Sequence, residues 1–229
     1  MGITREMSKI LSTSTAITTD AEISAYNYLS QSTASATYLN QTAYQPGLVL
    51  IRPTSVVNGT VGTNGTVTFS NAATVSLNGC FSSSYQDYKI IVSGLTSAAT
   101  ATLSVRLRSA GSDESSGSNF YKNHVQGVYA TGTTFAYGSN GSTSWENVFY
   151  LLNTSDNGGG VAEFDLKNPF ATVTTSGFMR CYAYQADTTT RTLRNGGMSH
   201  TAQSSYDGIS LIPTTSNISG TIKVYGYRD

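Results

Sequence analysis

The chain has 229 residues with 13 basic and 13 acidic side chains, so its formal net charge is zero. Charged residues make up 11% of the chain, against about 25% in an ordinary globular domain, while Ser and Thr together supply roughly 28%. This balance excludes a strongly basic nucleic-acid-binding surface and is typical of an extracellular or virion-surface protein. A hydrophobic content of 38% is enough to favour a folded core over disorder.

Neither membrane insertion nor classical secretion is expected. No run approaches the roughly 18 apolar residues that a membrane-spanning helix requires. The first ten residues, MGITREMSKI, lack the apolar core of a signal peptide.

Residues 1–45 differ from the remainder and are predicted to form an N-terminal attachment and trimerisation arm. Thr19 or Asp20 is suited to cap a short helix that continues to Leu29. A ten-residue repeat follows, because Tyr28-Leu29-Ser30-Gln31-Ser32 is echoed from Tyr38 onwards. Apolar pairs spaced in this way need a partner subunit or the body of the domain to become buried. A terminus that docks on nothing remains the alternative. The assembly residues predicted on this arm are Ile23, Tyr26, Tyr28, Leu29, Tyr38 and Leu39.

Pro46-Gly47 marks the start of a second domain, residues 46–229, in which strand-like runs alternate with turn dipeptides. The turns are expected at Asn58-Gly59, Asn64-Gly65 and Asn78-Gly79, since Asn and Gly tolerate positive φ. The clearest strand-like runs are 48–51, 67–69, 75–77, 88–92, 103–108, 161–166, 178–184, 209–212 and 218–227.

Weaker strand candidates lie near 120–128, 135–137, 148–152 and 190–198. About eight to twelve short strands are expected in all, the density of an antiparallel sandwich or jelly roll. No helical periodicity longer than two turns appears after residue 45. The predicted fold class is therefore all-β, an antiparallel β-sandwich or jelly roll preceded by a short, partly helical N-terminal arm.

Motifs for catalysis, cofactors or metals are absent from the sequence, so no catalytic, cofactor-binding or metal-binding residue is predicted. The two histidines, His124 and His200, have no metal or nucleophile motif around them. Glu163 and Asp165 would lie about 7 Å apart on one strand face, a spacing compatible with glycoside hydrolysis but more typical of a solvated strand face. Cys80 and Cys181 are expected to be buried free thiols, with a bridge between them as the alternative.

Recognition is favoured by loops that place aromatic residues among Gly, Ser and Asn. Tyr and Trp give large rigid contact areas, and small polar residues adapt their hydrogen bonds. Segment 129–145 places aromatic residues in this way, and segment 109–118 is a flexible stretch rich in Gly and Ser. For Trp145, packing in the core is the alternative to a surface role. The candidate recognition residues are Tyr129, Phe135, Tyr137, Asn140 and Trp145.

Three stretches carry a resemblance to a known class of proteins. They are the arm sequences 2–12, 18–23 and 33–39, the core segments FSSSYQDYKIIV (81–92) and LKNPFA (166–171), and the ending DGISLIP (207–213) through ISGTIKVYGY (218–227). In these stretches the chain resembles virion structural proteins of tailed bacteriophages, especially the short tail-fibre or fibre-tip proteins of marine and cyanobacterial phages.

The resemblance implies a non-enzymatic virion surface appendage, made in the host cytoplasm and commonly a homotrimer. Its arm would anchor to other virion proteins of the tail or capsid, and its β-domain would project towards host-surface glycan. The alternative is a capsid decoration or head-fibre protein with a particle-stabilising role. No nucleic acid and no cofactor is implied as a partner.

Overall fold

The computed structural model describes residues 47–151, 159–184 and 191–228. These residues form antiparallel strands, and no helix occurs among them. The predicted arm, with Ile23, Tyr26, Tyr28, Leu29, Tyr38 and Leu39, lies outside the described residues, and its predictions stay untested.

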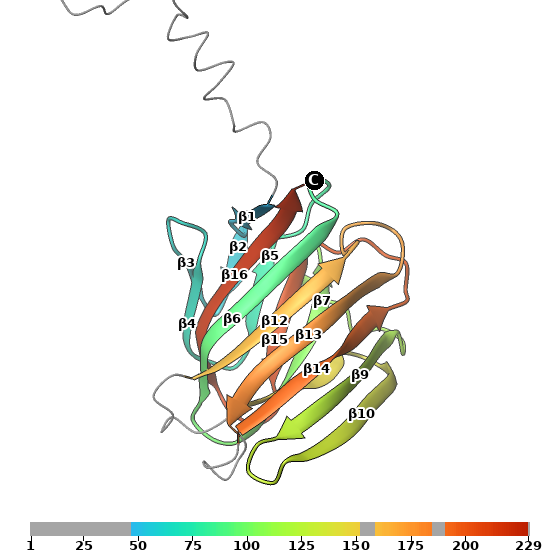
Figure 1. Ribbon diagram of the computed structural model, residues 1–229. Helices are drawn as coiled ribbons and strands as arrows, with labels where there is room; N and C mark the ends of the chain where they lie inside the picture. Colours follow the sequence, from blue (N-terminus) through green and yellow to red (C-terminus); the bar gives the residue numbers. More distant parts are fainter. Residues whose placement is uncertain (1–46, 152–158, 185–190, 229) are drawn as a thin grey trace, which may run out of the picture. The chain divides into compact units, whose positions relative to one another are not determined.

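The larger sheet contains ten strands in the order β10-β9-β14-β13-β12-β6-β16-β4-β3, and β1 pairs with β16 (Figure 1). Its strands are β1 (Gly47–Ile51), β3 (Thr60–Val61), β4 (Val67–Ala72), β6 (Asp87–Ser97), β9 (Phe120–Val128), β10 (Thr133–Ser142), β12 (Gly160–Lys167), β13 (Thr175–Tyr184), β14 (Arg191–His200) and β16 (Ile218–Arg228).

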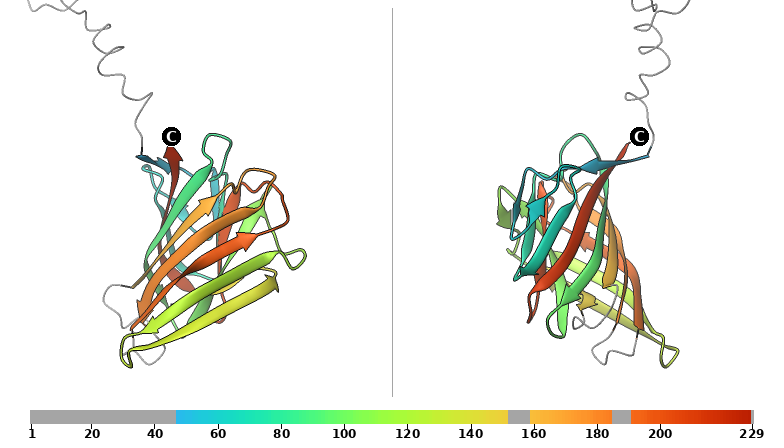
Figure 2. Two further views of the ribbon diagram at one scale, coloured as in Figure 1. Left: turned by 45° about the vertical axis from the view of Figure 1, so that its right-hand side comes forward. Right: turned by 90° about the vertical axis from the view of Figure 1, so that its left-hand side faces the viewer.

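The smaller sheet contains six strands in the order β11-β7-β15-β5-β2, and β8 pairs with β7. It lies behind the larger sheet in Figure 1, and the side views of Figure 2 show the two layers. Its strands are β2 (Ser55–Val57), β5 (Val75–Asn78), β7 (Ala101–Ser109), β8 (Ser112–Asp113), β11 (Trp145–Leu151) and β15 (Gly208–Pro213).

One hydrophobic core joins the inner faces of both sheets, as in a β-sandwich. In β6 and β12 of the larger sheet, burial alternates with a period of two, which places Ile90 and Phe164 inside and Lys89 and Glu163 outside. β7 of the smaller sheet contributes Leu103, Val105 and Leu107 to the same core. The alternation read from the sequence thus assigns the inner and outer faces correctly.

The described part of the chain holds sixteen strands, more than the eight to twelve expected. The excess comes mainly from β2, β3 and β8, which have two or three residues each and are too short for an alternation pattern. The turn predictions are confirmed, since Asn58, Gly65 and Gly79 all have positive φ.

Candidate functional site

A shallow groove lies on the outer face of the larger sheet, across β9, β10 and β14. It encloses about 550 Å³, a volume in the range of small-ligand sites. It is lined by Tyr121, Asn123, Gly138, Asn140, Gly197 and Ser199, and also by Lys122, Ser139 and Met198, which share the inward-facing positions of these strands.

Strand register assembles this groove from three segments that are distant in sequence. Gly197 of β14 pairs with Asn123 of β9, and Asn123 pairs with Gly138 of β10. On the other side of β14, Gly197 pairs with Phe178 of β13. Directly paired residues point to the same face of an antiparallel sheet. Phe178, Gly197, Asn123 and Gly138 therefore form one row, in which two glycines provide the floor and Phe178 stands at the end.

The glycine at position 197 is not required by the fold. A Cβ atom on Gly197 would meet no atom within 4 Å, and one on Gly138 would meet only a carbonyl oxygen of Lys122, at 3.6 Å. Gly196 is different, because its Cβ would lie 2.1 Å from the Asn123 carbonyl oxygen. Gly196 thus serves packing, whereas Gly197 keeps backbone and space open at the surface.

The groove presents neutral, amphipathic chemistry. Tyr121, Asn123, Asn140 and Ser199 offer hydroxyl and amide groups, and Phe178 exposes 65% of its surface beside them. The Lys122 side chain points to the opposite face, where its Nζ donates to the Glu146 carbonyl. The groove therefore suits a ligand with many hydroxyl groups and an apolar face that stacks on an aromatic ring.

Beneath the groove, the inner face of the same strands is basic, and its Lys122 and Arg194 side chains make structural contacts. β11 breaks register with β7 between Trp145 and Phe149, and Asn147 in this bulge has a φ of 50°. Lys122 Nζ donates to the Glu146 carbonyl and Arg194 Nη1 to the Asn147 carbonyl. Cys181 Sγ donates to the Val148 carbonyl at 3.2 Å. These side chains satisfy the carbonyl groups that the bulge removes from the ladder.

Burial controls the ionisation of this inner layer. Desolvation lowers the pKa of Lys122 to about 8, with a further contribution from the charge of Arg194. Desolvation, followed by the charges of Lys122 and Arg194, lowers the pKa of His124 to about 4. The neutral His124 ring stacks on Tyr137 with centroids 5.3 Å apart. His124 is therefore a packed, uncharged residue at neutral pH.

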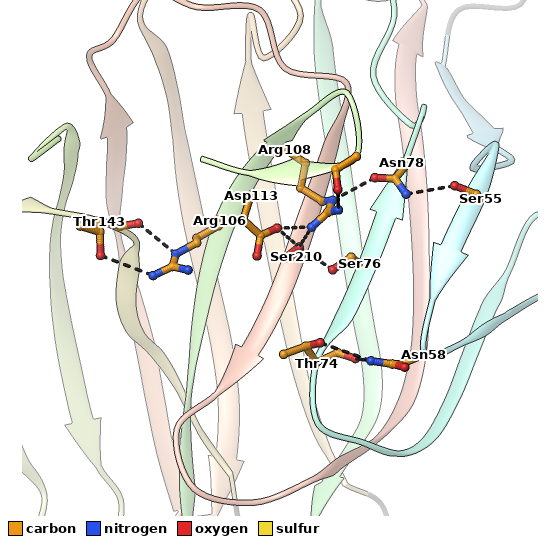
Figure 3. A network of polar contacts seen from close by, with 11 residues as sticks. Ser55, Asn58, Thr74, Ser76, Asn78, Arg106, Arg108, Asp113, Thr143 and Ser210 are labelled. Carbon is orange, nitrogen blue, oxygen red and sulfur yellow. Dashed lines mark hydrogen bonds and ion pairs between the residues drawn. The ribbon is translucent and has the colours of Figure 1, made fainter. Parts of the chain in front are cut away.

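A second polar cluster lies on the outer face of the smaller sheet, centred on Arg108 (Figure 3). Its Nε donates to Asn78 Oδ1 at 2.9 Å, and its Nη1 donates to Ser210 Oγ at 2.9 Å and to Asp113. The Ser210 hydroxyl in turn donates to Asp113 Oδ1 at 2.6 Å and lies 2.7 Å from the Ser76 hydroxyl.

This cluster, which we call the Arg108 network, has no nitrogen base next to its serine hydroxyls. Its guanidinium also binds the Gly111 carbonyl, and Asn78 Nδ2 donates to Ser55 Oγ at 3.0 Å. The network thus fastens the turn between β7 and β8 and links β2, β5, β7 and β15. The Arg108 network therefore holds residues 109–113, which belong to the segment 109–118 that the sequence predicts to be flexible.

Another hollow of about 630 Å³ lies beside β3 and β4. Its polar groups are already committed to the protein. Asn58 Nδ2 donates to the Thr74 carbonyl at 3.0 Å, and Asn217 Nδ2 donates to the Asn71 carbonyl at 3.1 Å. The one aromatic ring in its lining, Phe69, is buried. It is a weaker candidate than the groove on β9, β10 and β14.

The predicted recognition residues do not converge on one surface. Asn140 lines the groove. Phe135 and Tyr137 belong to β10, a strand rather than a loop, and share the inner-face side of the sheet with His124. Tyr129 is exposed after the end of β9 and packs edge-on to Tyr182 at 6.3 Å.

Trp145 belongs to the core, which was the alternative to a surface role for this residue. Its ring is fully buried, packs edge-on to Phe120 at 5.2 Å, and donates from Nε1 to the Ser199 carbonyl at 3.0 Å. This burial removes Trp145 from the side chains that a surface ligand could contact. The expectation of a surface role for Trp145 is wrong because burial of the apolar face of β11 places its ring in the core, although the neighbouring residues in sequence are polar.

The remaining chemical candidates serve as structural contacts. Glu163 Oε2 and Asp165 Oδ1 lie 3.1 and 3.6 Å from Lys89 Nζ, so one ammonium group joins both carboxylates. His200 is buried between Phe120 and Tyr206. Cys80 and Cys181 are buried and free, which confirms the default expectation.

Within the described residues, no group of three or more His, Cys, Asp or Glu side chains is placed to hold a metal ion. The same residues contain no helix with the length and hydropathy of a membrane span.

The sequence analysis missed five of the six outward-facing groove positions, and also Phe178. One usable signal was Asn195-Gly196-Gly197, because consecutive glycines inside a strand often mark a close approach of backbone or ligand. Tyr121 and Asn123 lie on the outward positions of a strand, and only strand register brings them to Gly197.

Comparison with known proteins adds no family assignment. No family model matches the sequence, and no curated protein matches it significantly. The functional argument therefore depends on the residues and their geometry.

Proposed function

We propose that this chain is a non-enzymatic virion fibre protein whose sandwich or jelly-roll β-domain binds a neutral glycan on the host surface. In this proposal residues 1–45 anchor a homotrimer to tail or capsid proteins. The observation that supports glycan binding is the glycine-floored groove between Phe178, Tyr121 and Asn140.

The groove suits weak, repeated binding better than tight capture. It is open and amphipathic, and the exposed ring of Phe178 lies beside it, next to Gly197. An individual contact of this kind is weak, but several copies on one fibre multiply the affinity through avidity. The low charge of the chain also fits a neutral ligand, since long-range attraction to an anionic polymer needs clustered basic groups.

A decoration or head-fibre protein is the second candidate, and the Arg108 network is the observation that favours it. The network stiffens one face of the smaller sheet, as a particle-stabilising protein requires. In that case the groove would be an ordinary solvent-facing hollow. Cryo-electron microscopy of the intact particle distinguishes the two, because a fibre lies at the tail and a decoration protein follows the head lattice.

Glycan binding is tested with the full chain on immobilised neutral oligosaccharides, with sialylated oligosaccharides as the anionic comparison. We expect saturable binding to at least one neutral glycan. We also expect Gly197→Val to abolish it, because the Cβ position has no atom within 4 Å and the new side chain extends from it into the groove.

Gly127→Val is the matched control. Gly127 also lies on the outer face of β9, and a Cβ there meets nothing within 4 Å, but it does not line the groove. Failure of the wild-type chain to bind any neutral glycan would contradict the proposal. Equal binding by the Gly197→Val and wild-type chains would place the site elsewhere.

A further inference from the structure

The free edge of the larger sheet at β10 is long, regular and unprotected. Residues 133–139 of β10 pair with β9 in unbroken register, and the bulge comes only after Ser139. β10 lies at the outer end of the sheet (Figures 1 and 2), so one side of its backbone has no neighbouring strand among the described residues. The sequence of β10, TTFAYGSNGS, contains no charged residue and no proline.

Natural proteins normally block such an edge with charges, proline, bulges or very short strands. The other strands at sheet ends in the described part of the chain are shorter or interrupted. β1, which pairs only with β16, has five residues. β3 has two residues and β2 has three. β11 carries a bulge whose carbonyl groups bind Lys122, Arg194 and Cys181. β10 is the exception.

We propose that β10 is an assembly edge, at which two copies of this chain pair their β10 strands antiparallel about a two-fold axis through Ala136. The midpoint of the regular segment 133–139 is Ala136. Pairing about this midpoint sets Phe135 of each copy opposite Tyr137 of the other. It sets Ala136 opposite Ala136, and Thr134 opposite Gly138.

Side-chain chemistry supports a second copy as the occupant of the edge. Phe135 and Tyr137 are 46% and 42% exposed and lie on the same side of β10. Two-fold pairing turns them into two cross-strand aromatic pairs, which stabilise antiparallel sheets. The uncharged strands do not repel each other, and the net charge of each chain is zero.

Symmetry also favours this arrangement. A head-to-tail contact would need β10 to pair with a different free edge of comparable length. β2 and β3 have three and two residues, β1 has five, and β11 is interrupted by its bulge. A contact between identical edges is instead closed and two-fold. The interface uses only β10 and is separate from the residues predicted on the arm.

The test measures the mass of the full chain by sedimentation equilibrium, together with hydrogen exchange of the β10 amides. We expect the wild-type mass to be halved in Ala136→Lys and in Ala136→Glu, with a dissociation constant raised by about tenfold or more because like charges face each other. We expect an equimolar mixture of the two variants to recover the wild-type mass, since Lys then faces Glu across the axis. The β10 amides are expected to be protected in the wild type and in the mixture, and exposed in each variant alone.

Val125→Lys is the matched control, because Val125 pairs with Ala136 inside the sheet, shares its face and is 49% exposed. We expect this variant to keep the wild-type mass. The proposal is overturned if both Ala136 variants have the same mass as the wild type, or if their mixture does not recover the wild-type mass. It is also overturned if Val125→Lys dissociates the assembly equally, because that would indicate face-to-face stacking of the sheets. Circular dichroism of each variant establishes that it is folded.

Discussion

Tyr88 and Ser82 are joined by two hydrogen bonds of 2.7 Å, in which the Tyr88 hydroxyl accepts from the Ser82 N–H and donates to its carbonyl. The Tyr88 ring is fully buried and packs edge-on against Phe81 at 4.8 Å. One side chain of β6 therefore anchors the irregular segment that leads into it.

Removing this hydroxyl leaves two backbone groups without their partner. We expect Tyr88→Phe to lower the free energy of unfolding by about 1–3 kcal/mol, measured by urea denaturation. Tyr129→Phe, at an exposed position, is the control and is expected to change stability by less than about 0.5 kcal/mol. A similar loss in both variants would show that the Ser82 contact is not responsible.

In the proposed binding function, Phe178 contributes to the contact with glycan and not to the core. We expect Phe178→Ala to keep wild-type stability, because the side chain is 65% exposed, and to weaken glycan binding by about five- to tenfold through loss of stacking. Affinity is measured by isothermal titration with the best neutral oligosaccharide from the immobilised panel. Phe170→Ala serves as comparison, since Phe170 is exposed but, unlike Phe178, is not paired with Gly197 of the groove. Equal effects of the two substitutions would argue against stacking beside the groove.

Asp113 neutralises a buried guanidinium. We expect Asp113→Ala to destabilise the domain by about 3 kcal/mol, because the buried Arg108 then loses its carboxylate partner. The double variant Arg108→Met/Asp113→Ala is expected to be more stable than the single Asp113 variant, since no charge is left buried. Urea denaturation of all four chains of this cycle measures the coupling. Additive losses would mean that the two residues do not interact energetically.

Acid is expected to destabilise the domain through His124. Its folded-state pKa of about 4 lies below the ordinary histidine pKa of 6.5. The unfolded chain therefore takes up a proton first as the pH falls. The contribution to stability is complete above pH 6.5 and is lost between about pH 6.5 and pH 4, with a magnitude of up to about 3 kcal/mol.

The comparison is His124→Phe, in which an aromatic ring is kept against Tyr137 but cannot be protonated. Urea denaturation at pH 7 and pH 4.5 is expected to show a smaller loss of stability for this variant than for the wild type. Equal losses in the two chains would assign the acid sensitivity to other groups, among which His200 also has a pKa lowered by burial.

Both thiols are expected to be inert in the folded protein. Desolvation raises the pKa of Cys80 and raises that of Cys181 to about 12, so almost no thiolate forms at pH 8. Mass spectrometry after iodoacetamide treatment is expected to show no labelled cysteine in the native chain and two in guanidinium. Rapid native labelling would show that the site opens locally.

The sequence analysis predicted the strands well where alternation continues for several residues. β6, β7 and β12 fall where the sequence expects them, because burial on one face dictates a period of two. β2, β3 and β8 escape such reasoning, since pairs formed by two or three residues depend on neighbours that only the tertiary fold provides.

The groove cannot be predicted from the local sequence for a related reason. Gly197, Asn123 and Gly138 are neighbours through register between three strands, which local sequence does not encode. Trp145 illustrates the opposite error, because a residue surrounded by Gly, Ser and Asn in sequence still occupies a core position once β11 lies under the larger sheet.

Alternation along β9 and β14 has a consequence for adaptation. Tyr121 and Asn123 face outward, while Phe120, Lys122 and His124 on the same strand face inward and hold the core and the β11 bulge. Mutations at the outward positions can alter which ligand is recognised while the inward positions continue to hold the scaffold. Ligand specificity and folding stability therefore depend on alternate residues of one strand, so a substitution that changes specificity has little effect on stability.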